Sequence, residues 1–299
     1  MSQTHSNNDD YQIPATAPTW LMNNLGLPGH SKMANSPNGD VHYLTWNWQE
    51  PLPVMCLVHG FRAHARWWDA LAPFFTDRYR VLSIDLPGMG DSGPALSYHQ
   101  DTYAEGILAV LESERLSDVT VIGHSFGGAQ TIRALCLRPE RFRRAIVVDS
   151  LVCLPGEDSI RLLEAKQQQR LRSSREDCIA DFRLLPEQPV VEEAILYHIA
   201  YHSCRPQGAG WRWKFDPAGI NYGEILDVAP LRRIAPRVDC IYGGQSMFAG
   251  QQRPEKTLAL FGNPGRLITI EQGYHHLMLD QPLVLKDAIS SLLSCSENG

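Results

Sequence analysis

Charged residues are scarce in this chain, and no long run of one sign occurs. They make up 20% of its 299 residues, and 27 Lys and Arg against 33 Asp and Glu leave a net charge of −6. Such a field repels phosphate backbones, and the densest basic stretch, Arg138–Arg144, contains Glu140. We therefore expect no nucleic-acid binding. Apolar and aromatic residues, at 43% and 9%, are too frequent for a disordered chain.

Long hydrophobic runs and paired cysteines are also absent. No stretch approaches the roughly 18 consecutive apolar residues of a membrane-spanning helix. The N-terminus, Met1–Asp10, is polar and acidic, unlike a secretory signal. Seven dispersed cysteines without a C-x-x-C pair are typical of reduced, buried thiols and not of a disulfide framework or a zinc site. These absences predict a cytoplasmic protein with no membrane contact and no metal.

Short apolar runs alternate with helical patterns along most of the chain. An Asn38-Gly39 turn between two alternating segments, the second at Val41–Trp46, indicates a β-hairpin. Helical patterns such as Tyr103–Glu114 and Ala129–Leu137 separate the later runs, which is typical of a parallel sheet covered on both faces. The expected buried strands are Val54–Val58, Val81–Ile84, Val119–Ile122, Ala145–Val148, Cys240–Tyr242 and Leu267–Ile270.

The region from Leu151 to Leu226 breaks this alternation because it contains no strand-like run. Helical segments, including Ser159–Arg172 and Val191–His202, dominate it. We therefore expect a helical cap at residues 151–226, inserted after the sixth strand of a core that comprises residues 31–150 and 227–299. Residues 1–30 form an N-terminal extension, of which the first 18 are expected to be a loose tail.

Near the end of the cap, aromatic residues alternate with cations in Trp211–Pro217. This segment could line a pocket for a carboxylate or aromatic substrate. The favoured interpretation is a hinge that packs Trp211 and Phe215 against the core and leaves Arg212 and Lys214 in solvent.

The segment Gly123-His124-Ser125-Phe126-Gly127 has the spacing G-x-S-x-G between an expected strand and an expected helix. A serine on such a tight turn projects its hydroxyl above the sheet, and the flanking glycines let neighbouring backbone approach closely. Ser125 is therefore the candidate nucleophile. The N–H of Phe126, at the start of the helix, is a candidate oxyanion donor.

A second oxyanion donor is expected from the loop after Val54–Val58. This loop reads His59-Gly60-Phe61, and its geometry directs the N–H of Phe61 towards the serine. His59 itself is interpreted as a structural residue of the loop.

A serine hydroxyl also needs a base to take its proton. Among 11 histidines, His275 and His276 are the best placed, because they follow the last expected strand and precede the final helix.

Together these motifs resemble those of the capped α/β-hydrolases, in their serine-hydrolase-like and dehalogenase- or epoxide-hydrolase-like branches. The resemblance is carried by His59-Gly60, by the loop Asp85-Leu86-Pro87-Gly88-Met89-Gly90-Asp91-Ser92, by the elbow and by the His275 segment. It implies an α/β-hydrolase fold, with a mostly parallel twisted sheet flanked by helices. In that family the Asp85 loop shapes the fold near the site, so Asp85 is interpreted as structural.

The resemblance also ranks the two histidines. In the superfamily the base commonly lies five residues before an acid-x-Pro that starts the last helix. Counting back from Asp280 selects His275 and leaves His276 as the runner-up.

The acid of the triad departs from the family pattern. Many members place it in the loop after the strand that is here Cys240–Tyr242, but Gly243–Phe248 contains no carboxylate. Asp239, before or inside that strand, is a weak candidate. Dehalogenase-like relatives place the acid at the end of the previous strand of the sheet, where this chain has Asp149. We favour Asp149 over a dyad that lacks an acid or uses a water.

A serine at the elbow excludes the dehalogenase and epoxide-hydrolase reactions of this fold, because water cannot release an alkyl group from a serine ether. Acyl chemistry remains. We expect a serine hydrolase that cleaves a small or medium carboxylic ester through an acyl-serine intermediate, as a monomer or homodimer. Its partner is a small-molecule acyl substrate, and no metal or organic cofactor is implied. A carbon–carbon bond hydrolase, a thioesterase, a lactonase and a non-catalytic ligand receptor remain alternatives.

Overall fold

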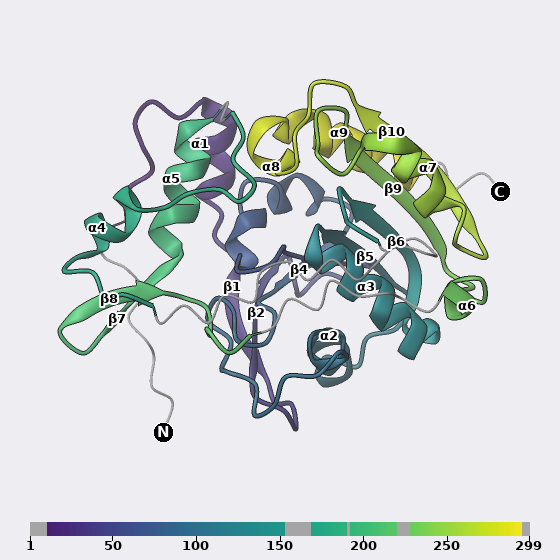
Figure 1. Cartoon of the computed structure of the whole chain (residues 1–299), viewed down its shortest axis with the longest axis horizontal. Helices are drawn as coiled ribbons and strands as arrows, with labels where there is room; N and C mark the ends of the chain where they lie inside the picture. The colour runs from purple at the N-terminus through teal and green to yellow at the C-terminus, as the bar shows by residue number, and fades with distance from the viewer. Residues whose placement is uncertain (1–10, 153–168, 190–191, 220–227, 295–299) are drawn as a thin grey trace.

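An eight-stranded sheet runs through the centre of the molecule, with helices on both faces (Figure 1). The computed structural model describes residues 11–152, 169–189, 192–219 and 228–294. The strand order is β1-β2-β4-β3-β5-β6-β9-β10; β2 is antiparallel to both its neighbours, and the other pairings are parallel. The strands are β1 (His30–Ala34), β2 (Val41–Trp46), β3 (Val54–Val58), β4 (Arg80–Ile84), β5 (Val119–His124), β6 (Phe142–Val148), β9 (Arg237–Gly243) and β10 (Pro264–Ile270). All six expected strands and the expected hairpin are confirmed, but β10, at the edge of the sheet, is only partly buried.

Alternate residues of the central strands enter two separate hydrophobic cores. In β3, Val54, Cys56 and Val58 face one core, whereas Met55 and Leu57 face the other. None of these side chains is more than 5% exposed. A strand that is buried on both faces must be apolar at every position, which explains its unbroken apolar run.

Helices and short 3-10 helices cover both cores. The first core is covered by α2 (Thr102–Ser113), α3 (Phe126–Leu137) and α6 (Val228–Leu231). The second is covered by α1 (Thr19–Leu25), η1 (Ala65–Trp68), η2 (Ala72–Phe75), α8 (Leu277–Asp280) and α9 (Pro282–Ser294). The remaining short elements of the core domain are η3 (Pro139–Arg141), η4 (Gly250–Gln252) and α7 (Arg253–Leu258). Within the described ranges, no helix is long and apolar enough to cross a membrane.

The insertion between β6 and β9 contains two described helices, α4 (Arg175–Ala180) and α5 (Glu193–His202), at the left of Figure 1. Helix α5 confirms the helical pattern at Val191–His202, whereas most of Ser159–Arg172 lies outside the described residues. The expectation that the insertion lacks strands was wrong: β7 (Cys204–Gln207) and β8 (Gly210–Trp213) form an antiparallel hairpin.

The hairpin has local causes that the hydropathy pattern does not show. Gly208, at a φ of 58°, closes a two-residue turn, and the aromatic residues Trp211 and Trp213 favour the extended conformation. The hairpin lies outside the central sheet, and its one further bridge joins Trp211 to Arg172, so its strands need no continuous apolar run.

The described part of the N-terminal extension is ordered against the rest of the protein, which corrects the expected loose tail as far as residues 11–18 are concerned. Leu21 of α1 is fully buried in the second core. The hydroxyl of Tyr11 lies 2.8 Å from Nδ1 of His198 in α5, and its ring centroid lies 4.9 Å from that of Tyr201. This segment therefore connects the core with the cap.

Candidate active site

The carboxyl ends of the parallel strands meet at one edge of the sheet, and the residues that the sequence singles out lie there. Phe61 follows β3, Ser125 follows β5, Asp149 follows β6, and His275 follows β10. Ser246 lies in the loop after β9. Open α/β sheets place their binding sites at this edge, because the loops from neighbouring strands converge there.

Ser125 occupies a strained turn between β5 and α3. Its φ of 54° and ψ of −124° are a backbone conformation that residues with a Cβ rarely adopt. The turn is possible because its neighbours lack side chains. A Cβ on Gly123 would lie 2.6 Å from the carbonyl oxygen of Gly127, and a Cβ on Gly127 would lie 2.2 Å from that of His59. The elbow glycines are therefore required by close backbone packing, as the sequence pattern predicts.

The structure brings the candidate acid and the candidate base together. Oδ2 of Asp149 lies 2.7 Å from Nδ1 of His275, and the two residues are 0% and 4% exposed. Asp149 directly follows β6 at a φ of 43°, and its own N–H donates to the carbonyl of Ile241 in β9. This backbone bond ties the acid to the neighbouring strand and turns its side chain towards His275.

The loop after β9, which has no carboxylate of its own, holds the carboxylate of Asp149. The N–H of Gly243 donates to Oδ1 at 2.9 Å, and the hydroxyl of Ser246 donates to Oδ2 at 2.6 Å. Sequence reasoning missed Ser246. The available signal was a hydroxyl residue in the loop where relatives place their acid.

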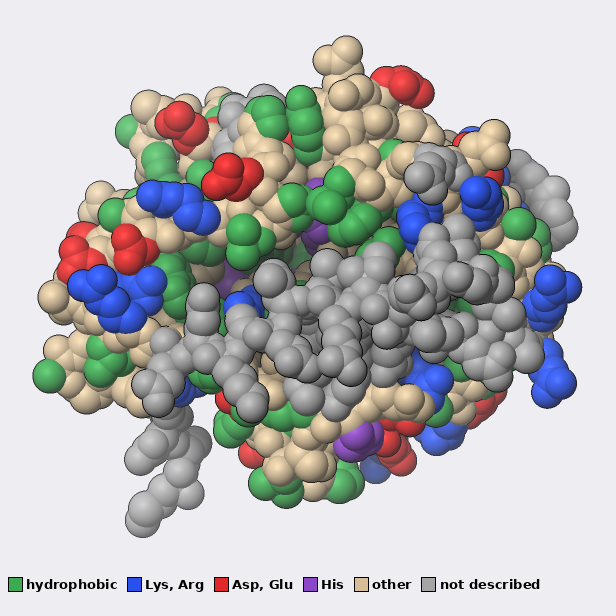
Figure 2. All heavy atoms as spheres, in the orientation of Figure 1, with side chains coloured by type: hydrophobic (Ala, Val, Ile, Leu, Met, Phe, Trp, Pro, Cys, Tyr) green, Lys and Arg blue, Asp and Glu red, His purple; other side chains and the backbone are tan. Residues whose placement is uncertain are grey.

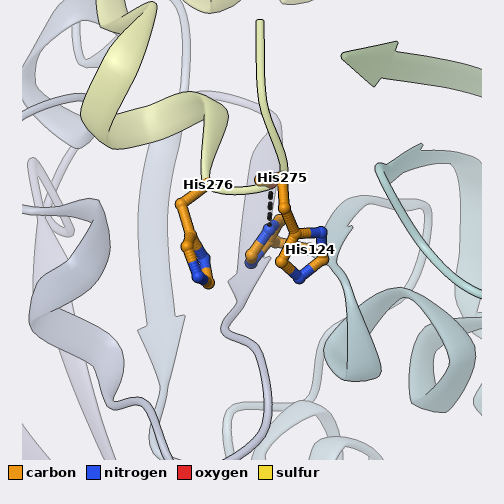
Figure 3. A group of neighbouring side chains, drawn as sticks. All are labelled: His124, His275 and His276. Carbon is orange, nitrogen blue, oxygen red and sulfur yellow. Dashed lines mark hydrogen bonds between the residues drawn. The ribbon is translucent and has the colours of Figure 1, made fainter. Parts of the chain in front are cut away.

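Two more histidines lie beside His275 (Figure 3). The ring of His124 donates from Nε2 to the backbone carbonyl of His275 at 2.9 Å. His276 packs against Trp67, with ring centroids 5.2 Å apart. Burial, reinforced by the charge of His275, lowers the pKa of His276 to about 3 and that of His124 well below its usual value. His275, and not the runner-up His276, is thus the histidine that pairs with Asp149.

The other acidic candidates hold the fold together. Asp239 is fully buried, and it pairs with Arg144 at 2.6 Å and with Arg237 at 3.2 Å. Asp85 accepts the N–H of Ala65 and lies 2.7 Å from Nδ1 of His42. Burial alone would raise the pKa of Asp85, but the bond with His42 lowers it far below the usual value. These contacts agree with the structural role that the sequence predicts for Asp85.

His59 is also engaged in the fold, as the sequence predicts. Its Nε2 accepts the N–H of Leu86 at 3.0 Å, and its Nδ1 lies 2.7 Å from the carbonyl oxygen of Gly60. Both contacts fix the loop after β3.

Gly60 brings this loop directly against the nucleophile. A Cβ on Gly60 would lie 3.4 Å from the Cβ of Ser125. Phe61 and Phe126 meet edge to face, with ring centroids 5.2 Å apart. Among the described residues, the backbone N–H groups of these two phenylalanines have no hydrogen-bond acceptor. Two donors next to a serine hydroxyl are the arrangement that an oxyanion requires.

A cavity of about 670 Å³ opens between the core loops and the cap, and it includes Ser125 and His275 in its wall. In Figure 2, histidine side chains are visible deep between apolar ones on this face of the molecule. The aromatic residues that line the cavity are Phe61, Trp67, Phe126, Phe182, Trp213, Phe215 and Phe248. The lining therefore suits a largely apolar substrate.

Part of the segment Trp211–Pro217 lies in the wall of the cavity. Trp213 and Phe215 line the cavity, and the guanidinium of Arg62 lies 4.6 Å from the ring centroid of Phe215. The expectation that Lys214 is free in solvent was wrong, because its ammonium pairs with Asp91 of the core at 2.8 Å. This ion pair anchors the cap to the core beside the cavity.

Comparisons with known proteins agree with this architecture. Residues 57–288 match the model of the alpha/beta hydrolase family. A putative esterase/lipase from Haemophilus influenzae is 24% identical over 242 residues, which cover 81% of this chain and 83% of that protein. A serine hydrolase-like protein from Mus musculus is 31% identical over 129 residues, 42% of this chain and 41% of that protein. The solved structure of E-2-(acetamidomethylene)succinate hydrolase superposes with a TM-score of 0.75 at 19% identity, covering 89% of this chain and 99% of that one. The chain therefore belongs to the alpha/beta hydrolase family.

Proposed function

We propose that this protein is a serine hydrolase that cleaves a small or medium carboxylic ester through an acyl-serine intermediate. Ser125 is the nucleophile, His275 the general base and Asp149 the acid, with the N–H groups of Phe61 and Phe126 as oxyanion donors. The proposal depends above all on the 2.7 Å contact between Asp149 and His275. This contact keeps the proton of neutral His275 on Nδ1, so that Nε2 carries the lone pair that a base needs.

The proposed reaction uses these groups in turn. Nε2 of His275 takes the proton of the Ser125 hydroxyl while its oxygen attacks the ester carbonyl, and Asp149 stabilises the resulting imidazolium. The negative charge on the carbonyl oxygen is held by two backbone N–H donors, and such a donor contributes about 3–4 kcal/mol where it has been removed by mutation. His275 then protonates the leaving alcohol. A water molecule, deprotonated by the same nitrogen, releases the carboxylic acid and restores Ser125.

The cavity and the relatives support an ester substrate. The cavity has a volume of about 670 Å³ and an aromatic lining, which fit a compact apolar acyl or alkoxy group. The Haemophilus influenzae relative is named a putative esterase/lipase. A thioesterase or a lactonase would use the same residues, and a carbon–carbon bond hydrolase or a ligand receptor stays an alternative. The cytoplasmic location and the state of monomer or homodimer stay predictions of the sequence.

The proposal is tested by measuring the mass of the intact protein after exposure to a fluorophosphonate probe. Such a probe forms a covalent adduct with an activated serine. We expect one adduct on the wild type and none on Ser125→Ala. Ser113→Ala, which removes an exposed hydroxyl from α2, is the matched control and should be labelled like the wild type. A labelled Ser125→Ala, or an unlabelled wild type, would contradict the assignment.

Turnover of a p-nitrophenyl ester separates the remaining alternatives. A hydrolase releases nitrophenol over many cycles, whereas a receptor gives at most one slow equivalent. A carbon–carbon bond hydrolase leaves the ester largely intact although its serine reacts with the probe.

A further inference from the structure

Three histidine rings meet in the wall of the cavity, and the proposed reaction uses only one of them (Figure 3). They belong to His124, His275 and His276, which are 1%, 4% and 5% exposed. One nitrogen of each ring lies within 4.8 Å of a nitrogen of the other two. Three neighbouring imidazole nitrogens are a ligand set that borderline divalent ions such as Zn²⁺ prefer.

The hydrogen bonds of two of these rings fix which nitrogen remains for a ligand. Nδ1 of His275 is engaged by Asp149, which leaves Nε2. Nε2 of His124 donates to the carbonyl of His275, and its Nδ1 is buried without a hydrogen-bond partner in the described structure. Histidines that bind metal ions almost always donate their other N–H to a carboxylate or a backbone carbonyl. Two of the three rings already have such a partner.

The third ring supplies a nitrogen that the fold does not use. In the described part of the chain, both ring nitrogens of His276 are buried and neither makes a close hydrogen bond, and the backbone of Leu185 can engage only one of them. An unpaired buried polar atom destabilises the fold, and a bound metal ion would give it a partner.

The spacing requires only a small adjustment. Three nitrogens that lie at most 4.8 Å apart can all be reached from a point within about 2.8 Å of each. Zinc–nitrogen bonds are about 2.0–2.1 Å long, so each ring would move inward by no more than about 0.7 Å, within the reach of side-chain rotations. Three protein ligands leave the fourth position of a tetrahedral ion for a water molecule.

We propose that His124, His275 and His276 form a binding site for Zn²⁺, and that the bound ion reversibly blocks the hydrolase. Nε2 of His275 cannot hold the ion and accept the proton of Ser125 at the same time, so the two states exclude each other. The inhibition rests on the proposed function, whereas the metal site does not.

The first experiment measures binding without any reference to activity. Co²⁺, which replaces Zn²⁺ in such sites, is titrated into the wild-type protein while its visible absorption is recorded, and Zn²⁺ binding is measured by calorimetry. We expect one ion per chain, with the intense visible bands of a tetrahedral or five-coordinate Co²⁺ and without a thiolate-to-cobalt charge-transfer band. Absence of binding at 0.1 mM free ion would overturn the proposal, and a thiolate band would place the ion on cysteine instead.

Four variants locate the ion. His276→Gln should weaken Zn²⁺ binding at least tenfold, and Asp149→Asn should weaken it by about 10- to 100-fold because it removes the partner of a ligand. Ser125→Ala should bind as the wild type does. His99→Gln is the matched control, because His99 is exposed beside Asp101 and Glu105, in a surface group that could also attract a cation. If His99→Gln weakens binding and His276→Gln does not, the ion occupies the surface group and the proposal is wrong.

A wild-type measurement keeps the proposal testable if His276→Gln does not fold. In ¹⁵N spectra of the histidine rings, Zn²⁺ should shift the resonances of three imidazoles and leave the other eight in place. Shifts confined to fewer than three rings, or spread over most of them, would refute the three-histidine site.

The two proposals fail in different ways. If Co²⁺ binds at the histidines but the protein does not turn over esters, the proposed function is wrong and the metal site stands. If esters are turned over and Zn²⁺ neither binds nor inhibits, the metal site is wrong and the hydrolase stands. Inhibition with an inhibition constant that differs from the calorimetric dissociation constant would show that the ion acts elsewhere.

Discussion

Removing the hydroxyl of Ser246 tests how this protein holds Asp149, the proposed catalytic acid. The carboxylate of Asp149 is fully buried, and it interacts with three groups: His275 and Ser246 at Oδ2 and the N–H of Gly243 at Oδ1. A hydrogen bond to a charged group contributes about 1.5–3 kcal/mol. If all of it were lost from the transition state, kcat/KM would fall by about 10- to 100-fold, since each 1.4 kcal/mol is about tenfold.

We expect Ser246→Ala to lower kcat/KM for an activated ester about tenfold, because the N–H of Gly243 still orients the other carboxylate oxygen. The loss should appear in kcat more than in KM, because the hydroxyl orients the acid and does not contact the substrate.

Rescue separates this positioning role from general damage to the fold. Ser246→Thr keeps the hydroxyl and should restore the rate, whereas Ser294→Ala, at the exposed end of α9, should leave it unchanged. If Ser246→Ala retains the wild-type kcat and melting temperature, the hydrogen bond to Asp149 does not contribute to catalysis and the reasoning is refuted.

Three further predictions follow from buried groups. Asp239→Asn should cost about 3–5 kcal/mol of unfolding free energy in urea, because it removes the negative charge beside the buried guanidinium of Arg144, yet fluorophosphonate labelling of the folded fraction should be unchanged. Loss of labelling would make Asp239 the acid. Burial lowers the pKa of His64 and His276 to about 3, so the unfolded chain binds protons first as the pH falls below 6.5. The free energy of unfolding should therefore fall by about 1.4 kcal/mol per pH unit for each histidine until pH 3. Equal urea midpoints at pH 7.5 and 5.5 would contradict this. Gly127→Ala should lose probe labelling, because its Cβ would lie 2.2 Å from the carbonyl oxygen of His59, whereas Gly250→Ala, with nothing within 4 Å, should behave as the wild type.

The sequence predicts the centre of each strand better than its start. The apolar run places the sixth strand at Ala145–Val148, but β6 begins at Phe142 and includes Arg144. Hydropathy cannot identify a buried arginine as a strand residue, because its charge is neutralised by Asp239 of β9, 95 positions away in the sequence. The ion pair with Arg144 also explains why Asp239 is buried in β9, although the sequence alone leaves it as a weak candidate for the acid.

The parts of the site fall into two groups by the range of the interactions that form them. The elbow at Ser125 depends on glycines within two residues, so a short motif identifies it. The position of Ser246 against Asp149 depends on how the loop after β9 folds over the end of β6, a contact across 97 positions. No local pattern encodes such a contact, so sequence reasoning could reach Asp149 but not the groups that hold it.

The geometry of the sheet explains how Asp149, the proposed acid, can reach His275 from the end of β6. Strands β6 and β9 are neighbours, with Val148 opposite Ile241, so their carboxyl ends lie about 4.8 Å apart. Asp149 crosses this gap because its N–H bonds to Ile241 and its φ of 43° turns the chain. Its carboxylate then reaches His275, and the loop that has lost the acid supplies a hydroxyl and an N–H in its place. An isolated buried carboxylate would take up a proton and could no longer stabilise an imidazolium. The hydrogen bonds from the loop after β9 therefore allow the acid to work from β6.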